Sequence, residues 1–74
     1  MNDGLNIMIG RRIKKQRKAL GLTREGLVNI ANPPLCSKYL WEIETGKKML
    51  SADMLRRLAI ALNVTADWLL GLPA

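Results

Sequence analysis

The residues of this sequence best suited to chemistry are its basic side chains. Twelve lysines and arginines stand against six acidic residues, which gives a net charge of +6 at pH 7. Seven of the twelve lie between Arg11 and Arg24, and Asp3 is the only acidic residue before them. A domain with this balance attracts polyanions, nucleic acid first and anionic membrane surfaces second. The simpler alternative is a solvated helix face that its lysines keep soluble, so the charge favours a polyanionic partner without proving one.

Residues for catalysis or metal binding are scarce by comparison. The sequence has no histidine and one cysteine, Cys36, which excludes a zinc site of the Cys/His kind. A nucleophile needs a base within hydrogen-bonding reach, and no such pair is evident. No glycine-rich loop is present to hold a phosphate group. We therefore predict that the protein is not an enzyme and uses neither a metal nor a cofactor.

The length and the apolar pattern limit the class of protein. The chain has 74 residues, which predicts one domain spanning residues 1–74. A single thiol cannot form a disulfide within the chain, and low cysteine usage fits a reducing compartment. The longest apolar run, residues 58–62, is far shorter than the roughly 20 residues that span a membrane. Residues 1–3 do not resemble the start of a secretory signal, so we expect a cytoplasmic protein without a membrane span.

Five segments have the hydrophobic periodicity of short helices, and no segment has the alternation of a strand. They span about residues 6–20, 23–31, 37–45, 51–63 and 65–70. The predicted apolar face of the first helix consists of Leu5, Ile9, Ile13 and Leu20. The sequence therefore predicts an all-α fold.

Local capping signals set the ends of these helices. Hydroxyl side chains stand before three helices, where they can cap free N–H groups, namely Thr23, Ser51 and Thr65. Gly21 and Gly46 end the first and third helices, because glycine reaches the left-handed conformation without a Cβ clash. Asn32-Pro33-Pro34 ends the second helix, since proline lacks an amide hydrogen. The second and third helices thus form a pair joined by a short turn, an arrangement that can present its second helix to the major groove of DNA.

Several pieces of the sequence stand in a family-specific order. They are Ile9-Gly10-Arg11-Arg12-Ile13, Arg17, Gly21-Leu22-Thr23-Arg24-Glu25, Leu40, Ile43-Glu44-Thr45-Gly46-Lys47, Leu55, Leu58-Ala59 and Asp67-Trp68-Leu69-Leu70-Gly71. In this order and spacing the chain closely resembles the Cro/phage-repressor helix-turn-helix family. The resemblance covers about residues 9–71. It implies a five-helix, lambda-repressor-like DNA-binding domain, with the helix-turn-helix at about residues 23–45 and its recognition helix at residues 37–45.

The resemblance also implies a set of contacts with DNA. In this family the positions that reach base edges match Ser37, Lys38, Trp41 and Glu42. The position matching Arg24, usually glutamine, contacts a phosphate, and basic residues in the loop that matches Lys47 and Lys48 contact the DNA backbone. We add Tyr39, whose hydroxyl could bind a phosphate. The family also carries a buried ion pair, which here would join Arg17 and Glu44.

Trp41 has a simpler interpretation beside the functional one. Leu40 and Ile43 define the inner stripe of the third helix, which places Trp41 on or beside the outer face. An exposed tryptophan is unusual and suggests a contact surface. It could instead lean over the turn and pack on Pro33 or Pro34.

The other candidates have simpler interpretations as well. Lys38 could be an ordinary surface lysine, and Glu42 could only orient Lys38 four residues earlier on the same helix face. As a DNA contact, Glu42 would accept a hydrogen bond from a cytosine amino group. Tyr39 could cover the flank of the core, and Arg24 could be a solvated helix start.

The sequence departs from the family pattern at the turn and at three other positions, one of which is Val28 in place of the usual small residue of the second helix. Pro33 and Pro34 lengthen the turn, which affects the angle of the third helix and leaves the fold intact. Cys36 replaces the usual cap of that helix, and we expect it to be a small buried residue. Gln16 stands where the family usually has a core leucine.

Two hypotheses of function follow. The first is a transcription regulator, a repressor of phage or bacterial type, which binds a palindromic operator in double-stranded DNA. It would be a homodimer formed through the helix at residues 65–70 and the tail, where the apolar residues exceed what a small core can absorb, namely Leu69, Leu70, Leu72 and Pro73. The second is an antitoxin-like or phage protein-interaction module that uses the altered outer face of residues 37–45.

Overall fold

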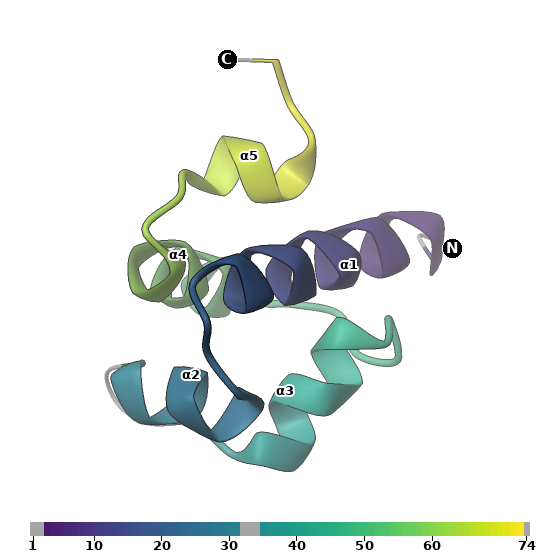
Figure 1. Cartoon of the computed structure of the whole chain (residues 1–74). Helices are drawn as coiled ribbons and strands as arrows, with labels where there is room; N and C mark the ends of the chain where they lie inside the picture. Colours follow the sequence, from purple (N-terminus) through teal and green to yellow (C-terminus); the bar gives the residue numbers. More distant parts are fainter. Residues whose placement is uncertain (1–2, 32–34, 74) are drawn as a thin grey trace.

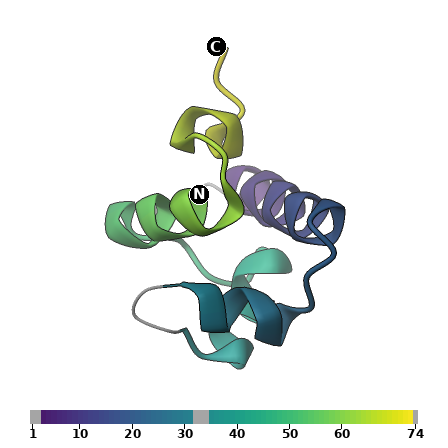
Figure 2. The ribbon, with the colours of Figure 1, turned by 60° about the vertical axis from the view of Figure 1, so that its left-hand side comes forward.

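The computed structural model describes residues 3–31 and 35–73. These residues form α1 (Asp3–Ala19), α2 (Arg24–Ile30), α3 (Ser37–Glu44), α4 (Ala52–Leu62) and α5 (Ala66–Leu70), and the described part contains no strand. α1 and α4 occupy the middle of the molecule, with α2 and α3 on one side and α5 on the other (Figures 1 and 2). The predicted all-α fold with five helices is confirmed.

The predicted caps are present in the structure. The hydroxyl groups of Thr23, Ser51 and Thr65 each accept a hydrogen bond from the backbone N–H three residues later. Gly21 and Gly46 have φ angles of 72° and 78°, which a residue with a Cβ rarely adopts. α1 begins at Asp3, earlier than the predicted residue 6. The predicted break at residues 32–34, and with it Pro33 and Pro34, lies outside the described residues.

One apolar core connects all five helices. Its fully buried large side chains are Ile13, Leu27, Leu40, Ile43, Leu58, Leu62 and Leu69. The inclusion of Leu69 contradicts its predicted place in a dimer interface, because the side chain is already used to seal α5 against the core. Leu72, by contrast, is exposed as predicted for the tail.

The predicted apolar face of α1 was only half right. Ile9 and Ile13 are buried, whereas Leu5 and Leu20 are exposed. Leu20 follows the last residue of α1, so it no longer continues the helix face, and Leu5 lies on the first turns, outside the main core. The next position on the buried face, one turn after Ile13, holds a charged residue, Arg17.

Two contacts explain how α1 docks on α3 and α4. At Gly10 the helix approaches α3 so closely that a Cβ would overlap the carbonyl oxygen of Ile43 and lie 2.7 Å from that of Glu44. Gln16, where a core leucine is usual, donates from Nε2 to the carbonyl oxygen of Leu62 at 3.2 Å. The glutamine therefore donates a hydrogen bond to a carbonyl oxygen in the last turn of α4, where carbonyl groups have no partner within the helix. A leucine could not do this.

No helix of the described residues combines the length and the hydropathy that a membrane span requires.

Candidate nucleic-acid interface

The outer face of α3 carries three of the eight residues predicted to contact DNA. Ser37, Lys38 and Trp41 are exposed, while Leu40 and Ile43 on the opposite side are buried. Because residues three or four apart share a helix face, the exposed three form one surface. The structure thus brings these three together on one side of the molecule, as the helical period predicts.

Lys47 and Lys48 follow α3 and are exposed. The ammonium group of Lys47 lies 5.6 Å from the centroid of the Trp41 ring, which is within the range of a cation–π contact. This contact connects the loop after α3 to the outer face of the helix. Trp41 itself is 40% exposed. Its alternative placement against Pro33 or Pro34 falls outside the described residues.

Tyr39 and Glu42 are partly buried and lie at the flanks of this surface. Tyr39 packs against the core, as its simpler interpretation predicts, and remains partly exposed. The simpler interpretation of Glu42 was an orienting contact with Lys38. Within the described part of the chain, the ion pairs join other residues, and none connects Glu42 with Lys38.

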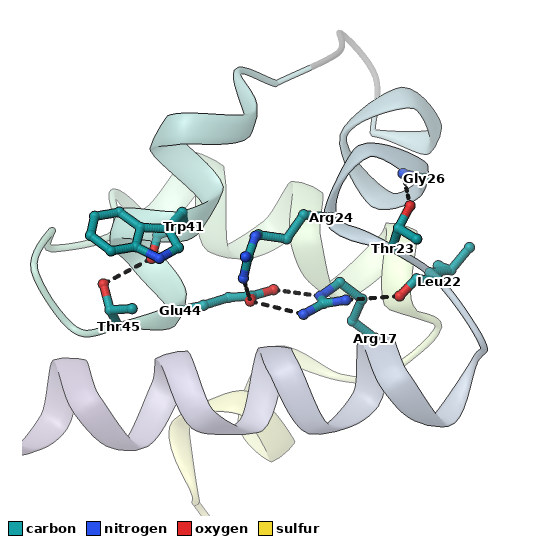
Figure 3. A network of polar contacts seen from close by, with 8 residues as sticks. All are labelled: Arg17, Leu22, Thr23, Arg24, Gly26, Trp41, Glu44 and Thr45. Carbon is teal, nitrogen blue, oxygen red and sulfur yellow. Dashed lines mark hydrogen bonds and ion pairs between the residues drawn. The ribbon is translucent and has the colours of Figure 1, made fainter.

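A buried ion pair lies between α1 and α3 (Figure 3). Arg17 Nε donates to Glu44 Oε2 at 2.7 Å and Arg17 Nη2 donates to Glu44 Oε1 at 3.1 Å. Arg17 Nη1 donates to the carbonyl oxygen of Leu22 at 2.8 Å. The two residues are 6% and 5% exposed, so both charges are almost removed from water and depend on each other. The pair joins α1 to the end of α3, and these are the two elements that the family resemblance implies for it.

Arg24 is also a partner of Glu44, which the sequence reasoning missed. Arg24 Nη1 lies 3.3 Å from Glu44 Oε1, while the arginine side chain is 39% exposed (Figure 3). The signal was available, because an arginine replaces the usual glutamine at the first residue of α2. Two guanidinium groups therefore share one carboxylate and leave a net positive charge there. One nitrogen of Arg24 is anchored, and its exposed atoms face solvent, where an anion could bind.

Cys36 differs from its prediction. The residue is exposed rather than buried, because it stands at the N-cap of α3, outside the helix's inner stripe. Its side chain makes no cap hydrogen bond of ordinary geometry. The backbone N–H of Tyr39, and next that of Lys38, nevertheless lower the pKa of the Cys36 thiol, because N–H groups directed at sulfur favour the thiolate. In the described part of the chain, no group of three acidic, cysteine or histidine residues is placed to hold a metal ion.

The chain is similar to known helix-turn-helix proteins over most of its length. A family profile with the description "Helix-turn-helix domain" matches residues 10–74. Among solved structures, the restriction-modification controller protein C.AhdI from Aeromonas hydrophila is 27% identical to this chain, with a TM-score of 0.82. The alignment covers 90% of this chain and 94% of that one. No curated protein sequence matches the chain.

Proposed function

Because this chain belongs to the helix-turn-helix domain family, we propose that it is a transcription regulator that reads an operator sequence in the DNA major groove with α3. The predicted resemblance to Cro/phage-repressor helix-turn-helix proteins is confirmed by the family match and by the structural match. The protein of the structural match is a restriction-modification controller protein. That similarity supports a regulatory role for this chain, for which we propose repression by occupying a promoter.

The observation that carries the proposal is the composition of the exposed face of α3. Ser37, Lys38 and Trp41 offer a hydroxyl, a cation and an apolar ring on one surface. Such groups match what base edges present in the major groove, where a lysine binds guanine acceptors and an apolar side chain contacts the thymine methyl. Glu42 at the flank would accept a hydrogen bond from a cytosine amino group.

Contacts with the DNA backbone would surround these base contacts. We assign Lys47, Lys48 and the Tyr39 hydroxyl to phosphates on one side of α3, and Arg24 to a phosphate at the start of α2. The hydrogen bond from Arg24 to Glu44 supports this assignment, since it restricts the guanidinium to one direction before DNA arrives. A side chain that is already ordered loses less entropy on binding.

We further propose that the protein binds a palindromic operator as a homodimer through α5 and the C-terminal tail. One small domain reads few base pairs, and dimers double the site with half-sites about 34–36 Å apart. An apolar groove supports this surface: Leu5, Leu55 and Leu70 line it together with Met49 and Leu50. Leu72, exposed in the tail beyond α5, offers a side chain that could fill such a groove in a second copy.

Selection of binding sites from a random pool of duplex DNA tests these proposals together. Enrichment of an inverted repeat with half-sites one helical turn apart is the expected result. Enrichment of a single half-site would contradict the dimer and leave sequence-specific binding intact. If no sequence were enriched, reading by α3 would be refuted, and the exposed Trp41 would then favour the protein-interaction module.

A further inference from the structure

A second surface with a distinct composition lies between α1 and α5. It is a groove of about 360 Å³. Its apolar side chains are Ile7, Met8 and Trp68, and its basic side chains are Arg11, Arg12 and Lys15. No lining residue comes from α2 or α3. α5 lies on the opposite side of α1 from α2 and α3 (Figures 1 and 2), so the groove involves none of the residues assigned to DNA.

Two contacts between Arg12 and Trp68 hold one wall of this groove together. The guanidinium carbon of Arg12 lies 5.1 Å from the centroid of the Trp68 ring, and Arg12 Nη1 donates to the Trp68 carbonyl oxygen at 3.0 Å. These contacts connect α1 to α5 and fix the orientation of both side chains. Arg12 keeps further N–H donors that these contacts do not use. Ile7, which also lines the groove, is 40% exposed. A partner that covered this apolar side chain would gain hydrophobic free energy.

The charge of the groove has one sign. Arg11, Arg12 and Lys15 contribute three positive charges, and none of the lining residues is acidic. Arg11 and Lys15 lie four residues apart, so both project from the same face of α1. We infer that this groove is a docking site for an acidic amphipathic helix of a partner protein. The apolar side of that helix would cover Ile7, Met8 and Trp68, while its carboxylates would pair with the basic side chains.

The apolar floor favours such a helix over nucleic acid. Phosphate groups would pair with Arg11 and Lys15, but they would leave the exposed side chain of Ile7 uncovered. A helix bound in a groove uses apolar anchors together with a polar rim, and both are present here.

A second copy of this chain is a poor occupant. None of its helices carries two acidic residues three or four apart, so none has an acidic face to present.

The two tryptophans allow a direct test, since Trp41 reports on the outer face of α3 and Trp68 on the groove. The full chain labelled with ¹⁵N is titrated with a short helical peptide that has glutamates on one face and leucines on the other. The two indole N–H resonances are assigned from the variants Trp41→Phe and Trp68→Phe. We expect the peptide to shift the Trp68 resonance and leave that of Trp41 in place.

Charge-reversal variants locate the site on α1. R11E/K15E changes the rim of the groove, and K14E/K18E makes the same change of charge at exposed residues of α1 that do not line it. The first pair should weaken peptide binding about tenfold or more, and the second by no more than about twofold, since only screened long-range attraction is lost. The melting temperature of each variant shows that it is folded.

Four results of the peptide and DNA titrations would overturn the inference. They are equal weakening by both variants, equal binding of a peptide with alanine in place of leucine, a peptide-induced shift of Trp41 as large as that of Trp68, and a shift of Trp68 by duplex DNA as large as that of Trp41. The last result would identify the groove as a nucleic-acid surface. A fifth result would also overturn it: a Trp68 shift that depends on protein concentration without peptide, and that R11E/K15E removes while K14E/K18E does not, would assign the groove to self-association.

Discussion

Glu44 is the residue on which the candidate interface depends most. Its carboxylate accepts hydrogen bonds from Arg17 and Arg24, and it is almost inaccessible to water. A buried charge is tolerated only when its partners replace the lost hydration, so each arginine has a structural reason to stay in place. Of the two, Arg24 is the one that also reaches the surface.

The buried pair predicts a strong effect on stability. Arg17→Met removes one partner and leaves the charge of Glu44 in the interior, supported only by the half-exposed Arg24. We expect the free energy of unfolding to fall by about 3–5 kcal/mol, close to the total for so small a domain. Urea denaturation followed by circular dichroism measures it. Lys18→Met is the control, because it removes the same charge from the next residue, which is exposed. A melting temperature of the Arg17 variant within a few degrees of the wild type would contradict the prediction.

Trp41 predicts a separation of stability from binding. The side chain lies on the outer face of α3 and touches Lys47 rather than the core. Trp41→Ala should therefore leave the melting temperature nearly unchanged and weaken operator binding about tenfold, as expected for an aromatic contact residue. A loss of several kcal/mol in stability would show that Trp41 packs as a core residue. Unchanged stability together with unchanged operator affinity would remove its DNA role.

At the scale of the elements, the docking of α1 on α3 positions everything behind the interface. Gly10 allows the backbones to approach, and further along α1 the guanidinium of Arg17 reaches Glu44 at the end of α3. A helix normally gains about 1 kcal/mol when alanine replaces glycine, so glycine at this position needs a steric reason. The neighbouring carbonyl oxygens of Ile43 and Glu44 supply it, because they belong to a backbone that cannot move aside alone.

Two substitutions in the same helix test this interpretation. Gly10→Ala should lower the free energy of unfolding by about 2 kcal/mol or more, since overpacking against backbone forces α1 and α3 apart. Gly4→Ala, where nothing lies within 4 Å of the new Cβ, should stabilise the protein by up to about 1 kcal/mol. Urea denaturation of both variants provides the comparison. Equal stability of the two would show that the close approach at Gly10 is not required.

At the scale of the whole molecule, charge determines how DNA would be approached. The net charge of +6 steers a polyanion toward the protein from any direction, but only residues on the α2–α3 side are placed to contact it in our proposal. Steering and contact differ in their dependence on salt and on sequence.

This difference predicts opposite behaviour for Arg24 and Lys38. Binding through Z phosphates weakens with salt with a log–log slope of about −0.9Z. Arg24→Ala should weaken all DNA sequences about equally and reduce the magnitude of the slope by about one. Lys38→Ala should relax the preference at one position of the site, at a cost of about 1–3 kcal/mol. Fluorescence anisotropy on operator and random duplexes over a range of salt measures both. Equal losses on both duplexes for Lys38→Ala would show that it reads no base.

The sequence by itself determined the features that depend on neighbours along the chain. Thr23, Ser51 and Thr65 cap their helices and Gly21 and Gly46 adopt positive φ, because caps and turns are formed within three or four residues. The family pattern added the pairing of Arg17 with Glu44, although these residues are far apart in the chain. The outward position of Trp41 followed from the helical period.

Only the tertiary structure decided features that depend on how the helices approach one another. Periodicity placed Leu5 and Leu20 on the same apolar face as Ile9 and Ile13, but the packing buries only Ile9 and Ile13, and Leu5 and Leu20 stay exposed. The second partner of Glu44 and the stacking of Arg12 on Trp68 each join two helices through long, flexible side chains. Such side chains have many rotamers, so their partners are fixed only when the helices around them are in place.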